Sequence, residues 1–103
     1  MKYANRIGYS DINPYEVVRV ISDKTIEIRE MDAKLAEGEK PQFIVGGFAG
    51  HCVNQRELKY DISSNDSNPV VRIRLRKNGY FYSSGGAKFK LADEPQYFYD
   101  YNF

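Results

Sequence analysis

A histidine and a cysteine stand side by side at positions 51 and 52, the one place in the sequence where a base adjoins a nucleophile. A catalytic Cys–His dyad needs the two side chains in hydrogen-bond contact. On a strand, neighbouring side chains point to opposite faces, and no second histidine is present to serve Cys52. We therefore expect a buried cysteine and a structural histidine, no catalytic residues, and a protein that is not an enzyme.

Metal and phosphate motifs are equally sparse. A single cysteine excludes an internal disulfide and a four-cysteine zinc site, and the carboxylates are too scattered for a calcium loop. Gly47-Phe48-Ala49-Gly50 lacks the lysine and hydroxyl residue that end a phosphate loop. It also lacks the flanking helices with which KH domains use such a tetrapeptide. The sequence predicts no metal, no cofactor, and a bend at these glycines.

Basic residues are concentrated between residues 56 and 90, although the net charge of the whole chain is only +1. Three arginines alternate along one predicted strand and two lysines along a later one, so each set shares a face. If these strands are neighbours, the cations form a stripe with tyrosines beside it. We call this candidate binding surface the basic face: Arg72, Arg74, Arg76, Tyr80, Tyr82, Lys88 and Lys90.

Three interpretations of the basic face are open. Arginine and tyrosine are enriched at the centres of protein interfaces, so the face could dock a host or phage protein. It could equally hold the phosphates of a nucleic acid while a tyrosine stacks on a base. The structural alternative is a solvated outer face whose arginines pair with Glu27, Glu30 or the acidic C-terminal segment.

Alternation of apolar and polar residues with a period of two dominates the chain. It predicts a hairpin from Tyr15–Ile21 and Thr25–Met31. In the first strand, Tyr15, Val17, Arg19 and Ile21 should share one face, and in the second Ile26 and Ile28 should. The strand at Val70–Arg76 should point Val71, Ile73 and Leu75 inward. The Asn78-Gly79 pair then predicts a tight turn into a strand at 80–82.

Shorter strands are expected at 43–45, 51–55, 58–62, 88–91 and 96–103. In the fourth of these Phe89 and Leu91 should face inward, and the last should close on the core with Tyr97, Tyr99, Tyr101 and Phe103 on one face. Residues 31–40 are expected to be a long loop with at most one short helical turn. Residues 63–69, all turn formers, should be the clearest loop.

These elements predict one β-rich domain spanning residues 1–103, of the all-β class. A small antiparallel barrel or a compact β-sandwich is expected, because closure removes exposed edges. The first hairpin is similar in layout to that of SH3-like barrels, an analogy at the level of the fold. Nine tyrosines and six phenylalanines favour such a fold as well.

The longest apolar run, Phe43–Gly50, is far short of the roughly 20 residues that a membrane span needs. The first residues lead into no apolar signal core. We therefore expect a cytoplasmic protein without a membrane partner, and the sequence leaves its oligomeric state open.

Three segments carry a resemblance: Asn13–Ser22, Gly47–Gln55 and Tyr99–Phe103. They resemble a family of small uncharacterised proteins carried by phages, prophages and plasmids. The resemblance implies a mobile-element origin and action by stoichiometric binding, including inhibition of host defence systems, but it assigns no site residue. The expected function is thus a non-enzymatic binding module that docks a protein through the basic face as an anti-defence inhibitor. The alternative is a nucleic-acid-binding β-barrel that uses the same face.

Overall fold

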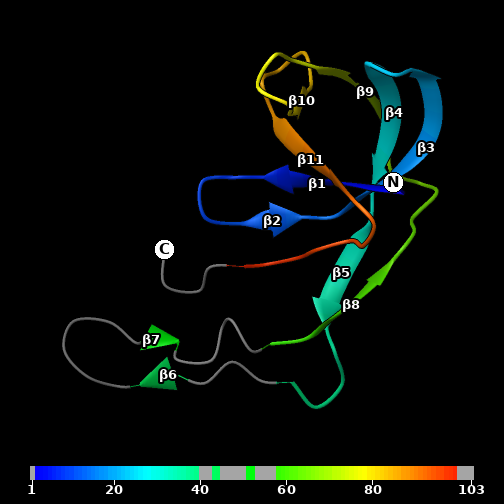
Figure 1. Cartoon of the computed structure of the whole chain (residues 1–103). Helices are drawn as coiled ribbons and strands as arrows, with labels where there is room; N and C mark the ends of the chain where they lie inside the picture. The colour runs from blue at the N-terminus through cyan, green and yellow to red at the C-terminus, as the bar shows by residue number, and fades with distance from the viewer. Residues whose placement is uncertain (1, 40–42, 45–50, 53–57, 100–103) are drawn as a thin grey trace.

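The computed structural model describes residues 2–39, 43–44, 51–52 and 58–99 (Figure 1). Every regular element in these ranges is a strand, so the expected all-β class is confirmed. The strands are β1 (Tyr3–Ile7), β2 (Ile12–Asn13), β3 (Tyr15–Ser22), β4 (Thr25–Glu30), β5 (Asp32–Leu35), β6 (Phe43–Ile44), β7 (His51–Cys52), β8 (Tyr60–Ser63), β9 (Val70–Leu75), β10 (Phe81–Tyr82) and β11 (Lys88–Ala92).

Six of these strands close into an antiparallel barrel in the order β1-β3-β4-β9-β10-β11 (Figure 1). Closure depends on β1, which pairs with β3 on one side and with β11 on the other. Along the second of these ladders, Tyr3 lies opposite Ala92 and Ile7 opposite Lys88. The predicted small barrel is confirmed, and its closure pairs β1 with β11, the two outer strands of these six.

The barrel encloses a core whose members are at most 5% exposed: Ala4, Ile26, Ile28, Ile73, Phe81 and Phe89. The predicted inward alternation of Ile26 with Ile28 on β4 is confirmed. So is that of Val71, Ile73 and Leu75 on β9, and of Phe89 and Leu91 on β11. Burial of each such isoleucine or phenylalanine contributes about 1.5–3 kcal/mol. This core fixes which side chains of β9–β11 point outward.

The sequence patterns missed β1 and β2, which form a hairpin at the start of the chain. Ile7 lies opposite Ile12 and Arg6 opposite Asn13, and the same register places Tyr3 opposite Glu16 on β3. Pro14, which is fully buried, interrupts the ladder that β2 and β3 form with β1, because proline has no amide hydrogen to donate. One long strand is therefore divided into two.

The predicted faces of β3 are wrong in its second half. Val17 lies opposite Ile28, but the position opposite Ile26 belongs to Val20, which is 67% exposed beside a hollow that Ile26 also lines. Arg19 instead lies opposite the outward residue Glu27. The register with β4 shifts twice because Val18 and Ile21 are extra residues that have no partner on β4, and each such bulge reverses the alternation.

The loop expected at 31–40 contains a strand instead. The chain continues past β4 into β5, which pairs antiparallel with β8. Ala33 and Leu35 are the less exposed residues of β5, and Gly38 takes a positive φ of 86° in the turn that follows. Pairing with a distant strand overrides the low strand propensity of this charged, alanine-rich segment. The loop predicted at 63–69 is confirmed from residue 64 onward, since Ser63 is the last residue of β8.

Residues 96–99, the described part of the C-terminal aromatic segment, form no closing strand, because β1 and β11 close the barrel. Within the described residues this segment makes a single bridge, in which Phe98 and Ile12 exchange two backbone hydrogen bonds of 2.9 and 3.0 Å. The side chain of Asn5, only 2% exposed, donates to the Glu94 carbonyl and accepts from the Gln96 amide. Asn5 thus fastens this segment against β1.

Some predictions fall outside the described residues. These are the bend at Gly46–Gly50, the strand continuation at 53–55, and the positions of Tyr101 and Phe103. His51 and Cys52 form β7 opposite Ile44 and Phe43, but the expected burial of the cysteine also lies outside what the structure describes. In the described part of the chain, no helix has the length and apolar character to cross a membrane.

Candidate functional site

The strands that carry the basic face are neighbours, because β10 lies between β9 and β11. Arg74 is opposite Tyr82, and Tyr82 is opposite Lys88, so the three form one row across the outside of the barrel. The row follows from the sequence, because the Asn78-Gly79 turn fixes the register between β9 and β10. Inward-facing Phe81, beside Tyr82, holds β10 to the core.

Each tyrosine of the basic face has a cation over its ring. The guanidinium carbon of Arg76 is 4.3 Å from the centre of the Tyr82 ring. The ammonium nitrogen of Lys88 is 4.3 Å from the centre of the Tyr80 ring. At these distances the attraction between cation and ring contributes about 0.5–1 kcal/mol at an exposed site. The two contacts restrict the directions in which Arg76 and Lys88 can point.

The turn between β9 and β10 positions both tyrosines. The Asn78 side chain donates a 2.7 Å hydrogen bond to the Tyr82 hydroxyl and accepts one of 3.1 Å from the Tyr80 amide. Gly79 has a φ of 87°, which is strained for residues with a side chain. Arg76 accepts a backbone hydrogen bond from Gly79 and donates one to the Tyr80 carbonyl.

At the other end of the basic face, a carboxylate joins two arginines. Glu27 on β4 lies 3.2 Å from an Arg72 nitrogen and 3.7 Å from an Arg19 nitrogen. The structural interpretation of the basic face, in which its arginines pair with carboxylates such as Glu27, therefore holds for Arg72. Within the described part of the chain, Arg74 makes no ion pair.

A hollow of about 510 Å³ opens on this face, and we call it the arginine hollow. It is lined by Val71, Arg72, Arg74, Arg76, Tyr82, Ser83 and Ser84. No carboxylate is among these lining residues. The Ser83 hydroxyl oxygen accepts a hydrogen bond from the Ala87 amide, which leaves its O–H to donate. Guanidinium groups and hydroxyls supply donors here, so the hollow is suited to an anion.

Two differences from the sequence prediction concern the limits of the site. Lys88 and Lys90 lie opposite Ile7 and Asn5 of β1, and neither lysine lines the hollow. Tyr80 does not line it either. Ser83 and Ser84 line it and were not predicted. The turn at residues 83–86, in which Gly86 has a φ of 91°, brings them there. The only feature of the sequence that could have indicated Ser83 and Ser84 as site residues is that they directly follow Tyr82.

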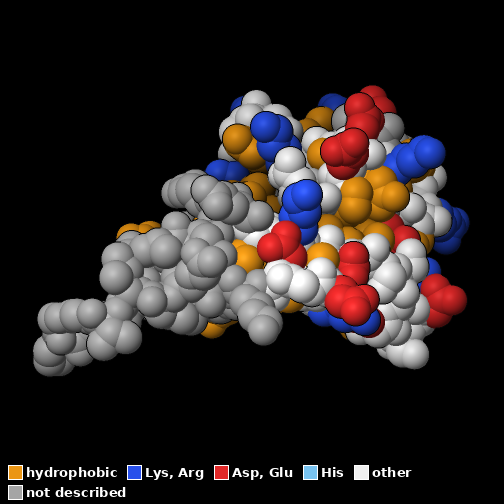
Figure 2. All heavy atoms as spheres, turned by 90° about the horizontal axis from the view of Figure 1, so that it is seen from below, with side chains coloured by type: hydrophobic (Ala, Val, Ile, Leu, Met, Phe, Trp, Pro, Cys, Tyr) orange, Lys and Arg blue, Asp and Glu red, His pale blue; other side chains and the backbone are white. Residues whose placement is uncertain are grey.

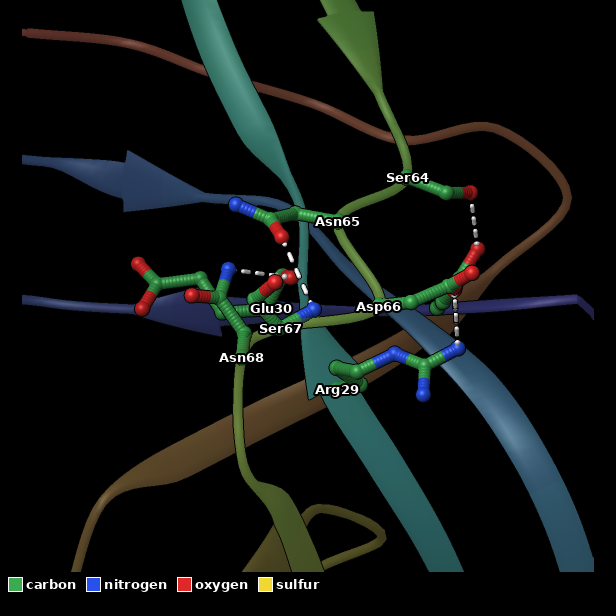
Figure 3. Close-up of polar contacts among 8 residues, drawn as sticks. Arg29, Glu30, Ser64, Asn65, Asp66, Ser67 and Asn68 are labelled. Carbon is green, nitrogen blue, oxygen red and sulfur yellow. Dashed lines mark hydrogen bonds and ion pairs between the residues drawn. The ribbon is translucent and has the colours of Figure 1, made fainter.

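A second polar cluster fastens the loop at residues 63–69 to the barrel (Figure 3). Arg29 on β4 lies 3.2 Å from a Glu16 oxygen and 3.1 Å from an Asp66 oxygen. Ser64 donates a 2.6 Å hydrogen bond to the other Glu16 oxygen, and Asn68 donates to the Glu30 carbonyl. Because these groups bind one another and tie the loop to β3 and β4, we assign this cluster a structural role.

One described group has a shifted pKa. Burial raises the pKa of Tyr15 above its ordinary value of 10.0, the carboxylate of Glu30 raises it further, and the nearby charge of Arg6 partly opposes this. The Tyr15 ring meets the Phe89 ring nearly edge-on, with centres 5.0 Å apart. Tyr15 is therefore part of the packed wall of the barrel and not of the basic face.

Charges of both signs are interspersed on one face of the molecule (Figure 2). Figure 2 shows blue and red side chains side by side around apolar areas on the face seen from below. This agrees with the net charge of +1. Among the described residues no three His, Cys, Asp or Glu side chains are grouped so as to hold a metal ion.

No protein-family model, curated protein or solved structure matches this chain. The resemblance to phage- and plasmid-borne proteins and the SH3-like layout therefore stay predictions. The candidate site depends on its geometry alone.

Proposed function

We propose that the protein is a non-enzymatic binding module that docks an acidic segment of a protein partner on the basic face. The observation that carries this proposal is the arginine hollow, where Arg72, Arg74 and Arg76 surround a space lined by no carboxylate. Arginine forks bind carboxylates through paired hydrogen bonds, so a group of three attracts an acidic peptide.

The three arginines have different parts in the proposed contact. Arg72 is braced by Glu27, and Arg76 is held over Tyr82. Both are preorganised, so a partner immobilises fewer free side chains on binding. Arg74, between them on β9, has no ion pair among the described residues and is the fork that an incoming carboxylate would engage first. Ser83 adds a hydroxyl donor.

The same contacts favour a protein over a nucleic acid. Stacking of a base needs an open aromatic face, and cations cover one face of both Tyr80 and Tyr82. Nucleic-acid binding through this face is the competing outcome of the experiment below.

In biological terms, we propose that the protein acts in the cytoplasm as an anti-defence inhibitor, and that its partner is a host protein. A stoichiometric inhibitor needs only a surface that its target recognises, and the basic face supplies one. The role depends on the resemblance stated above and is tested by whether the chain protects a phage from host defences only when the arginines are intact.

The test compares an acidic peptide with a single-stranded oligonucleotide of equal charge, both measured by calorimetry. Hexaglutamate and oligothymidylate are suitable probes. We expect hexaglutamate to bind at least as tightly as the oligonucleotide, and Arg72→Gln with Arg74→Gln to abolish its binding. Lys34→Gln with Lys59→Gln removes two exposed cations elsewhere and serves as the matched control. Tighter oligonucleotide binding, or equal losses in both double variants, would contradict the proposal.

A further inference from the structure

One edge of the barrel wall has a strand on one side only. Tyr3 of β1 lies opposite Glu16 of β3, and the Val17 amide donates a 2.9 Å hydrogen bond to the carbonyl of Lys2, the residue before β1. From Arg19 to Ser22, β3 continues along β4, while its other side faces no strand among the described residues. Unpaired amides and carbonyls of this kind are a template for another strand.

The same edge exposes apolar side chains. Val18, Val20 and Ile21 are 38%, 67% and 41% exposed, which makes them half of the exposed large hydrophobic residues in the described part of the chain. Val18 and Ile21 are the bulged residues that have no partner on β4. Beside them a largely apolar hollow of about 340 Å³ opens into the barrel wall, lined by Val17, Val20, Ser22, Asp23, Ile26, Phe81 and Leu91.

We propose that this edge binds a second copy of the chain, with the two β3 strands antiparallel about a two-fold axis near Ile21. In that arrangement Arg19 of each copy faces Asp23 of the other. Arg19 is 68% exposed and its one ion pair among the described residues, to Glu27, is 3.7 Å long. Asp23 is exposed and has no ion pair within the described residues. The edge is therefore complementary in charge to itself.

Two-fold pairing also closes the assembly. Each copy uses the same residues, so the contact is isologous and leaves no free β3 edge for further addition. In the order of the sheet β4 separates β3 from β9, so each copy keeps its basic face. The dimer presents two copies of that face, and this inference does not depend on what the face binds.

Sedimentation velocity at concentrations up to about 1 mM tests the proposal, a range that detects weak association. The wild-type chain is expected to form dimers, and Val20→Lys should weaken the association by about tenfold or more, because a buried lysine charge opposes strand pairing. The matched control Val70→Lys alters a 49% exposed valine on β9 and should leave the association unchanged. A monomer throughout, or equal effects of both variants, would overturn it.

Cross-linking tests the register. In a Cys52→Ser background, Ile21→Cys places two thiols across the two-fold axis, at a separation that a disulfide can span. We expect a disulfide-linked dimer, and none from Val70→Cys in the same background. Arg19→Asp should weaken dimerisation, and Arg19→Asp with Asp23→Arg should restore it. Cross-linking that is equal at both cysteines, or no rescue by the charge exchange, would refute this arrangement.

Discussion

The guanidinium group of Arg76 lies over the ring of Tyr82, with its central carbon 4.3 Å from the ring centre. Tyr82 is in turn opposite Arg74 in the ladder between β9 and β10. One tyrosine therefore positions one arginine by stacking and lies beside a second by register. Tyr82 therefore limits the directions in which the neighbouring arginine side chains can point, and this gives the basic face a defined arrangement of charges.

Substitution of Tyr82 should separate its two contributions. Tyr82→Phe removes the hydrogen bond from Asn78 but keeps the ring under Arg76. Tyr82→Leu removes both. We expect hexaglutamate binding to fall about twofold to fivefold in the leucine variant, in line with about 0.5–1 kcal/mol for the stacked pair. The phenylalanine variant should lose less. Equal losses, measured by calorimetry, would show that stacking has no part in binding.

Removal of the Glu27 charge should strengthen the binding of an acidic peptide. Glu27 shares its carboxylate between Arg72 and Arg19, and in Glu27→Gln this competing anion is absent. Because Arg72 is half exposed, the pair contributes only about 0–1 kcal/mol, so the gain should be about fivefold or less. Weaker binding of hexaglutamate by the variant would mean that Glu27 acts chiefly by positioning Arg72.

Asn5→Ala should destabilise the fold by about 1–3 kcal/mol, because two buried hydrogen bonds are lost together. Urea unfolding measures this change. Hydrogen exchange should also become faster at the Gln96 amide, whose partner is removed, while amides in the β4–β9 ladder should change only with global stability. Unchanged protection of Gln96 would show that Asn5 does not hold the C-terminal segment.

Arg29 and Asp66 should differ sharply although they contact each other. Arg29→Met leaves the carboxylate of Glu16, whose side chain is only 19% exposed, without its cation. A loss of about 1–3 kcal/mol is expected, because the remaining charge is poorly hydrated. Asp66 is 91% exposed, and Asp66→Asn should change stability little. Thermal unfolding of both variants tests this, and equal effects would contradict the assigned role of Arg29.

Alkaline pH should destabilise the barrel through Tyr15. Its raised pKa means that the folded state holds the phenol proton to higher pH than the unfolded chain does. The stabilisation is complete below the ordinary value of 10.0 and is lost as pH rises from there through the folded pKa. Urea unfolding at neutral pH and above about pH 10 should show a smaller alkaline loss in Tyr15→Phe than in the wild type. An equal loss of stability in the two proteins would show that Tyr15 does not cause the alkaline destabilisation.

Much of the basic face could be predicted because its geometry is local. Alternation along β9 fixes which side chains are outward, and the Asn78-Gly79 turn sets the neighbour of that strand. Arg74 and Tyr82 were therefore placed together from spacing alone. The position of Lys90 opposite Asn5 could not be predicted, because β1 was not recognised.

The features that sequence reasoning missed depend on distant partners. The segment that contains β5 has a loop-like composition and becomes a strand only because β8 pairs with it. The bulges at Val18 and Ile21 arise from the register between β3 and β4, and neither residue type is a sequence signal for a bulge. Ser83 and Ser84 are ordinary turn residues until the fold places them beside the arginines.

The central claim is that the arginine hollow receives an acidic segment. The most direct measurement is NMR of the arginine Nε–H groups during titration with hexaglutamate. We predict saturable shifts for Arg74 and Arg76, a smaller one for Arg72, which Glu27 already engages, and none for Arg29, whose Nε is buried. Shifts at Arg29 equal to those at Arg74, or no saturable shift at any of the three arginines of the hollow, would contradict the account.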